Sequence, residues 1–205
     1  MKVGILGGTF DPIHTGHILI AEEARLKLEL ARIIFVPAGQ PWLKMKRQIT
    51  PAVHRVEMVK LAIAGNASFE LSTVEVDRAG PSYSVDTVDI LHRQLGAAAS
   101  IFFLVGWDSL AELPQWHQPA RLIQLCHLVA VTRPGLSRPD LKSLESSVPG
   151  INRSVVWLDI PPIDISSSDI RERVARGLSI RGLVPESVES YIKENKLYRK
   201  RKQAT

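Results

Sequence analysis

The stretch VGILGGTFDPIHTGH, residues 3–17, joins a short apolar run to a pair of glycines and then to a pattern with helical spacing. The apolar run predicts a buried strand, and the apolar residues spaced over 18–30 predict an amphipathic helix. Glycines let a backbone approach a phosphate closely, and the free N–H groups at the start of a helix favour an anion. The junction therefore predicts an anion-binding site, although it matches neither GxGxxG nor GxxxxGK(S/T).

Strand and helix patterns alternate along the rest of the chain. This alternation favours right-handed crossovers and an α/β fold with a single doubly wound, mostly parallel sheet covered by helices on both faces. A sheet of this kind binds its ligand at the carboxyl ends of its strands, at the point where the strand order reverses. The predicted strands are residues 3–6, 33–36, 69–76, 101–105, 128–131 and 155–160. The predicted helices are residues 18–30, 51–64, 84–95, 119–125, 140–147, 168–176 and 186–193.

Composition excludes several classes of protein. The chain has 205 residues, of which 45% are hydrophobic and 23% charged, as in ordinary globular proteins. The length favours one large domain. The longest nearly apolar run, residues 97–107, is too short to span a bilayer, and we find no export signal, so we expect a cytoplasmic protein with no membrane partner. The single Cys126 excludes a disulfide within the chain and any CxxC motif.

The positive charge is concentrated at one end of the sequence. The formal net charge is +5, and residues 193–205 hold six Lys or Arg against Glu194, so residues 1–192 sum to zero. We therefore expect a domain over residues 1–198 and a disordered basic tail over 199–205, with no nucleic-acid partner. A role of residues 199–202 in binding nucleic acid is the alternative. It would give a salt-dependent affinity that is lost when the tail is removed.

Two histidines follow the glycine pair. If the helix starts near Thr15, His14 and His17 lie on one face and both point at the predicted anion site. Gly16 between them removes a side chain that would crowd the ligand. The same pair together with Asp11 could instead bind zinc, for which no fourth ligand is evident.

Residues 7–17 resemble the GGTFDPIHxGH signature of the nucleotidyltransferases that share an HxGH motif, and among these the bacterial nicotinate-mononucleotide adenylyltransferases. In that family the two histidines lie against the ATP phosphates, and neighbouring backbone amides help to hold them. The resemblance implies a Rossmann-like nucleotidyltransferase fold. It also implies that His14 and His17 are catalytic and that Gly8, Thr9 and Phe10 line the ATP site.

Two further segments resemble the ATP-binding motifs of the same family. The segment ISSSDIR, residues 165–171, offers capping hydroxyls and free N–H groups at a helix start. It resembles the family's ISSTxIR, which implies that Ser167, Ser168 and Arg171 hold the β- and γ-phosphates. The segment GWDS, residues 106–109, resembles GxDS and implies that Gly106 and Asp108 lie near ribose hydroxyls.

Other segments resemble the family's mononucleotide site. PSYSVDT, residues 81–87, resembles PSYTxDT, which surrounds the nicotinate carboxylate and implies roles for Tyr83 and Ser84. The segment LPQWH, residues 113–117, resembles the family's LPxWH and implies that the Trp116 indole stacks on the pyridine ring. The segment RPG, residues 133–135, resembles the family's RPG turn and implies that Arg133 helps to hold the mononucleotide; a purely structural turn is the alternative.

The segment QPWLK, residues 40–44, departs from the PPHK or PPHR stretch that follows the second strand in the family. Lys44 aligns best with the basic residue that meets the mononucleotide phosphate, but Lys46 and Arg47 are neighbours, and the choice among the three stays open. His54 and Arg55 open a predicted helix, and we expect their role to be mainly structural.

The resemblance runs from about residue 2 to 198. It implies transfer of the adenylyl group of ATP to nicotinate mononucleotide by direct in-line displacement, giving deamido-NAD and pyrophosphate, with Mg²⁺ bound mainly through phosphates and water. The attacking phosphate is already an anion, so the protein needs only to hold two polyanions and neutralise charge. The alternatives are another HxGH transferase, such as pantetheine-phosphate adenylyltransferase or a cytidylyltransferase, and a non-catalytic nucleotide-binding regulator. Selectivity for acid over amide and a homo-oligomeric state stay open.

Overall fold

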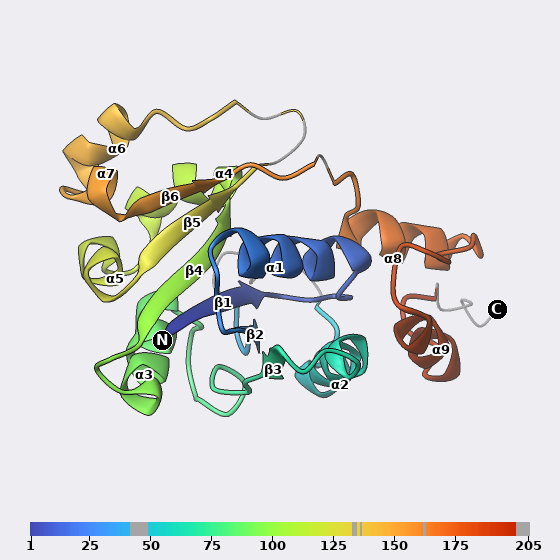
Figure 1. Ribbon diagram of the computed structural model, residues 1–205. Helices are drawn as coiled ribbons and strands as arrows, with labels where there is room; N and C mark the ends of the chain where they lie inside the picture. The colour runs from blue at the N-terminus through green and yellow to red at the C-terminus, as the bar shows by residue number, and fades with distance from the viewer. Residues whose placement is uncertain (42–48, 133–134, 136, 162, 200–205) are drawn as a thin grey trace.

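A parallel sheet forms the centre of the molecule (Figure 1). The structure is a computed structural model that describes residues 1–41, 49–132, 135, 137–161 and 163–199. In this part of the chain the sheet has six strands in the order β3-β2-β1-β4-β5-β6, and every pairing is parallel. The strands are β1 (Lys2–Gly8), β2 (Arg32–Pro37), β3 (Phe69–Leu71), β4 (Ser100–Gly106), β5 (His127–Val131) and β6 (Val155–Leu158). The predicted α/β fold is confirmed, and the strand order reverses between β1 and β4.

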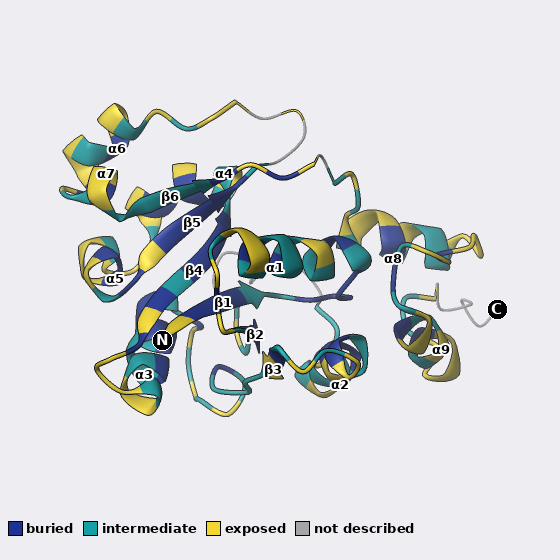
Figure 2. Cartoon of the chain, viewed as in Figure 1, coloured by how far each residue is buried: buried dark blue, intermediate teal, exposed yellow. Residues whose placement is uncertain are grey.

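Helices cover both faces of the sheet. Neighbouring residues of a strand point to opposite faces, so Val3 and Ile5 of β1 belong to one apolar core and Leu6 belongs to the other. The core around Leu6 is covered by α1, α2, α8 and α9, whereas α3 to α7 cover the opposite core. Figure 2 shows the central strands largely buried between them. The helices are α1 (Thr15–Lys27), α2 (Ala52–Ile63), α3 (Ser84–Leu95), α4 (Trp107–Ala111), α5 (Pro119–Leu125), α6 (Leu141–Ser147), α7 (Ile151–Ser154), α8 (Ser167–Ala175) and α9 (Glu186–Glu194), with a 3₁₀ turn η2 (Leu113–Gln115).

The third predicted strand is too long. It was expected to reach residue 76, but β3 ends at Leu71. The Thr73 carbonyl accepts the N–H groups of Val76 and Asp77, and the Thr73 hydroxyl donates to the Asp77 carboxylate at 2.6 Å. These local hydrogen bonds form a turn, which outweighs the strand preference of the β-branched residues.

Two further predictions concern a membrane-spanning segment and the basic tail. Within the described ranges, no helix is both long and apolar enough to cross a membrane. The predicted basic tail lies outside those ranges except for Arg199, so the tail stays a prediction.

Candidate active site

His14 and His17 stand at the start of α1, directly after the loop that follows β1. The helix begins at Thr15, which meets the condition set for the two histidines, whereas the predicted range began at residue 18; His14 is its N-cap residue. The two imidazole rings stack with their centroids 3.7 Å apart. His14 is buried and His17 half-buried. The prediction that both rings lie on one face is therefore confirmed.

The hydrogen bond between the two histidines fixes which nitrogen of His17 can serve a ligand. Nδ1 of His17 accepts the backbone N–H of His14 at 3.2 Å. A neutral imidazole whose Nδ1 is an acceptor carries its proton on Nε2. In the neutral ring the proton of His17 therefore lies on Nε2, while Nδ1 caps the helix.

Gly16 serves the packing of the site itself. A Cβ at this position would lie 2.8 Å from Cγ2 of Ile163 and 3.0 Å from Nδ1 of His14. Real Cβ atoms are almost never found so close to another heavy atom. Gly16 was predicted to leave room for a ligand; in the structure the space beside it is filled by the His14 ring and Ile163.

Side chains of α2 and α8 donate hydrogen bonds to the carbonyl groups of the β1–α1 loop, residues 9–14. Figure 1 shows α8 beside the start of α1, which brings two of the donors into reach. Because a trans peptide directs its N–H away from its C=O, the amides of Phe10 and Ile13 point away from the donors. The carbonyl of Thr9 accepts Nη1 of Arg55 at 2.8 Å, that of Asp11 accepts Nη1 of Arg171 at 2.7 Å, and that of Pro12 accepts the Ser167 hydroxyl at 2.9 Å.

The serine cluster opens α8 as predicted. Ser166 is the N-cap, and its hydroxyl accepts the N–H of Asp169 at 3.1 Å. Nη2 of Arg171 donates to the Ser168 hydroxyl at 3.2 Å. The structure thus brings Ser167, Ser168 and Arg171 together against the loop that carries the histidines.

Gly106 and Asp108 lie at the carboxyl end of β4. Leu6 of β1 pairs with Leu104 of β4, and each strand runs two residues further, to Gly8 and Gly106. Asp108 stands in the first turn of α4 and is exposed. Both predicted ribose residues therefore lie at the edge of the sheet where the β1–α1 loop begins.

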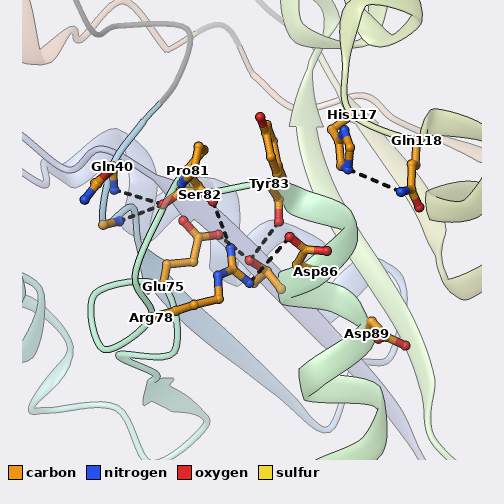
Figure 3. A network of polar contacts seen from close by, with 12 residues as sticks. Gln40, Glu75, Arg78, Pro81, Ser82, Tyr83, Asp86, Asp89, His117 and Gln118 are labelled. Atoms are coloured by element: carbon orange, nitrogen blue, oxygen red, sulfur yellow. Dashed lines mark hydrogen bonds and ion pairs between the residues drawn. The ribbon is translucent and has the colours of Figure 1, made fainter.

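The predicted mononucleotide residues are brought together by α3 and the η2 turn. Tyr83 is the N-cap of α3, and Ser84 is its first residue. The His117 ring stacks on Tyr83 with 4.2 Å between centroids (Figure 3). Trp116 is half-buried and meets Phe103 edge to face at 6.4 Å. The stacking role of His117 was missed, although it stands within the LPQWH segment.

A buried polar network supports this side of the site (Figure 3). The Thr87 hydroxyl donates to Glu75 at 2.6 Å, and the Ser82 hydroxyl accepts the N–H groups of Gly39 and Gln40 at 2.9 and 3.0 Å. A Cβ on Gly39 would lie 2.0 Å from the Glu75 carbonyl oxygen, so only glycine fits there. Burial raises the pKa of Glu75, and hydrogen bonds from Thr87 and Ser82 oppose the shift.

The contacts that two further side chains make with the β1–α1 loop were not predicted from the sequence. Arg55 was expected to be mainly structural, and its burial at 2% exposure agrees with this, but its bond to the Thr9 carbonyl was not foreseen. The Tyr198 hydroxyl donates to the Asp11 carboxylate at 2.8 Å. Tyr198 and Asp11 are 187 positions apart, and Arg55 and Thr9 are 46 apart, so no local sequence pattern indicates these contacts. The Tyr198 position was visible only as part of the LY ending that resembles the family.

Some predictions fall outside the described residues or concern metals. Lys44, Lys46, Arg47 and Arg133 lie outside the described ranges. Among the residues that the structure does describe, no group of three His, Cys, Asp or Glu could hold a metal ion. The Asp11 carboxylate, the third ligand of the zinc alternative, accepts hydrogen bonds from Tyr198 and from the N–H of Thr50.

The chain is similar to known proteins over nearly its whole length. A family model described as cytidylyltransferase-like matches residues 5–173, which defines the class as nucleotidyltransferase. A relative from Dehalococcoides mccartyi is 48% identical over 97% of both chains. Another from Thermomicrobium roseum is 46% identical over 97% of this chain and 92% of its own, and both are named "Probable nicotinate-nucleotide adenylyltransferase". The chain belongs to the nicotinate-nucleotide adenylyltransferase family.

A solved structure supports the fold independently. Plasmodium falciparum nicotinic acid mononucleotide adenylyltransferase, complexed with NaAD, superposes with a TM-score of 0.78. The match covers 96% of this chain and 97% of the other, at 19% sequence identity. Identity this low shows a common fold and carries no residue roles across.

Proposed function

We propose that this member of the family transfers the adenylyl group of ATP to nicotinate mononucleotide, with deamido-NAD and pyrophosphate as products. The proposal rests on the conformation of the β1–α1 loop. Arg55, Arg171 and Ser167 donate hydrogen bonds to its carbonyl groups, and the stacked His14 and His17 rings lie at the start of α1. Such a loop presents N–H groups and imidazole donors to an anion without a nucleophile of its own.

The proposed step is a direct in-line displacement. A phosphate oxygen of the mononucleotide attacks the α-phosphorus of ATP, a new P–O bond forms, and the bond from that phosphorus to the bridging oxygen breaks to release pyrophosphate. The attacking oxygen is already an anion, so no general base is required. The proposed contacts to ATP are His14 and His17 at the reacting phosphate, Gly8, Thr9 and Phe10 along the loop, Ser167, Ser168 and Arg171 at the other phosphates, and Gly106 and Asp108 at ribose.

The mononucleotide is proposed to bind beside the start of α3. Its carboxylate would lie beside Tyr83 and Ser84 and meet N–H groups of the first turn of α3, where the dipole of a 12-residue helix favours negative charge. The Tyr83 N–H itself donates to the Pro81 carbonyl at 3.0 Å. The half-buried Trp116 offers a ring face for stacking on the pyridine. Lys44 and Arg133 are proposed for the mononucleotide phosphate.

The donor set around the loop fits a metal ion that arrives on ATP. Mg²⁺ prefers oxygen ligands in octahedral geometry. The Asp11 carboxylate of the loop already accepts hydrogen bonds from Tyr198 and Thr50, and the other side chains at the loop include imidazole and guanidinium donors. When bound through the triphosphate and water, Mg²⁺ supplies further neutralisation of phosphate charge. The chain's own residues then orient the phosphates and stabilise the charge that develops on them.

We further propose residues 1–198 as the nucleotidyltransferase domain, since the Tyr198 hydroxyl still bonds the β1–α1 loop. ATP and nicotinate mononucleotide are its proposed partners, with neither nucleic acid nor membrane. We place it in the cytoplasm, where a free thiol such as Cys126 stays reduced.

A panel of substrates tests the proposal. The protein is incubated with Mg²⁺ and either ATP plus nicotinate mononucleotide, ATP plus phosphopantetheine, or CTP plus a phosphorylated acceptor, and the products are identified by mass. We expect deamido-NAD and pyrophosphate in the first mixture alone. Product in either other mixture would favour a different HxGH transferase, and no product in any mixture would favour the non-catalytic regulator.

A further inference from the structure

Arg55 is a buried cation to which the proposed reaction assigns no task. Its side chain on α2 is 2% exposed. Burial lowers the pKa of its guanidinium, and the negative charge of Asp11 opposes the shift. A buried charge is tolerated only when its donors are satisfied. Here Nε donates to the Thr50 carbonyl and Nη1 to the Thr9 carbonyl, both at 2.8 Å.

The Thr9 carbonyl belongs to the peptide group that joins Thr9 to Phe10, and Phe10 has a positive φ. Phe10 has a φ of 49°, a left-handed conformation that is unfavourable for a residue with a side chain. Such a conformation persists only when the surroundings hold it. The Phe10 ring is 2% exposed and meets the His17 ring edge to face at 5.0 Å. A shift of the Thr9–Phe10 peptide would therefore move both the Phe10 amide and a neighbour of the His17 imidazole.

Arg55 is one member of a connected set of side chains behind the loop. The Asp11 carboxylate accepts the Tyr198 hydroxyl at 2.8 Å and the Thr50 N–H at 3.3 Å. Thr50 is thus held at its N–H by Asp11 and at its carbonyl by Arg55. Burial and the charge of Asp11 raise the pKa of Tyr198, which keeps its hydroxyl protonated as a donor. We call Asp11, Thr50, Arg55 and Tyr198 the loop anchor.

We propose that Arg55 is a positioning residue for adenylyl transfer, which fixes the Thr9–Phe10 peptide so that the Phe10 amide and the His17 ring meet the ATP phosphates. This rests on the proposed function, in which that amide contacts a phosphate. Arg55 acts through the backbone, because its burial keeps it away from a substrate. A lysine cannot reproduce the two bonds, since only guanidinium offers donors in a rigid fork.

A purely structural Arg55 would behave differently. It would stabilise α2 against the core, and its loss would lower activity only as far as the folded fraction falls. Val59 provides the matched control, because it lies on the same helix, is fully buried and belongs to the apolar core. Val59→Ala loosens α2 without removing a bond to the loop.

The experiment compares Arg55→Lys, Val59→Ala and the unmodified protein at a temperature where all are folded. It measures the Kd of α,β-methylene-ATP by calorimetry together with steady-state kinetics. We expect Arg55→Lys to weaken analogue binding and raise the KM for ATP by about tenfold, and to lower kcat, because small misplacements of contact groups are costly. The KM for the mononucleotide should stay within about twofold. Val59→Ala should lower Tm alone. Equal analogue affinity in Arg55→Lys and the unmodified protein, or equal losses in the two variants, would overturn the proposal.

Tyr198→Phe keeps the question decidable if Arg55→Lys does not fold. It preserves the ring and removes the hydroxyl that Asp11 accepts, so analogue binding should weaken by about threefold, and unchanged binding would overturn the proposal. The proposed function is judged separately. A protein that binds the analogue and makes no deamido-NAD overturns the function alone, whereas one that does not bind the analogue overturns both.

Discussion

At the level of single residues, each imidazole of the histidine pair has a distinct structural position. His14 ends the loop as the N-cap of α1, and the Nδ1 of His17 accepts its backbone N–H. The ring stacking and this hydrogen bond orient the His17 imidazole before a substrate arrives. Orientation of this kind matters because a fixed donor needs no reorganisation when charge develops.

His17→Ala is expected to lower kcat by about 100- to 1,000-fold, the effect of removing one fixed donor to a developing charge. The fold should survive, since the lost helix cap is worth only about 1 kcal/mol. Steady-state pyrophosphate release and circular dichroism measure the two effects. His127→Ala, an exposed histidine at the start of β5, is the control and should leave kcat unchanged. A His17→Ala enzyme of normal kcat would remove His17 from the site.

Trp116→Ala tests the stacking role proposed for the indole. Its Nε1 is buried and lacks a hydrogen-bond partner within the described part of the chain, so the ring face is the part a ligand can use. We expect the KM for nicotinate mononucleotide to rise by about tenfold, since one stacking contact contributes about 1 kcal/mol beyond its buried area. The KM for ATP should stay nearly constant. Equal increases in the two KM values would contradict stacking.

At the level of elements, local signals in the sequence predicted those helices whose starts and ends they mark. The helices over 84–95 and 119–125 were predicted with their observed bounds, whereas α1 begins at Thr15 and not at the predicted residue 18. The short helices α4 and α7 were missed, because a single turn leaves no periodic pattern. Residues 72–76 were assigned to a strand, because their β-branched side chains outweighed the turn signal in Thr73 and Asp77.

Glu75→Gln tests the network that joins the start of α3 to Gly39 and Gln40. The raised pKa of Glu75 means that the folded protein binds its proton more tightly than the unfolded chain, in which the usual value is 4.5. Its contribution to the free energy of unfolding therefore falls as the pH rises above about 4.5 and through the raised pKa.

The glutamine removes this titration. Thermal unfolding across that pH range should show the Tm of Glu75→Gln gaining on that of the unmodified protein as the pH rises. Thr87→Val, which removes a hydrogen bond to the carboxyl, should shift the same titration upward. A Tm difference between Glu75→Gln and the unmodified protein that stays constant with pH would show that Glu75 does not titrate differently in the folded state.

At the level of the whole molecule, the site is assembled from segments that the sequence keeps far apart. The pairing of β1 with β4 places the carboxyl ends of both strands, at Gly8 and Gly106, on the same edge of the sheet, and α8 brings Arg171 to the Asp11 carbonyl. The motifs that resemble the family identified these segments. The Arg55 and Glu75 contacts could not be predicted, because burial and long-range partners, rather than residue type, define their roles.

A pair of truncations tests where the domain ends. Removal of residues 199–205 should leave kcat and Tm unchanged, because the Tyr198 bond to Asp11 is retained. Removal of residues 198–205 deletes that bond and the packing of the Tyr198 ring, and should destabilise the protein by about 2 kcal/mol and weaken ATP binding. Urea unfolding and calorimetry give the readouts. Equal losses in both truncations would place the end of the domain beyond Tyr198.

The most direct test of the account is the rate of pyrophosphate release with ATP and Mg²⁺, compared between nicotinate mononucleotide and nicotinamide mononucleotide. A carboxylate gains from the helix N-terminus at Tyr83 and Ser84, whereas a neutral carboxamide gains little, so we predict a kcat/KM about tenfold or more higher for the acid. Comparable values would contradict the carboxylate site and leave the chemistry intact. The absence of release with either substrate would contradict adenylyl transfer to a pyridine mononucleotide altogether.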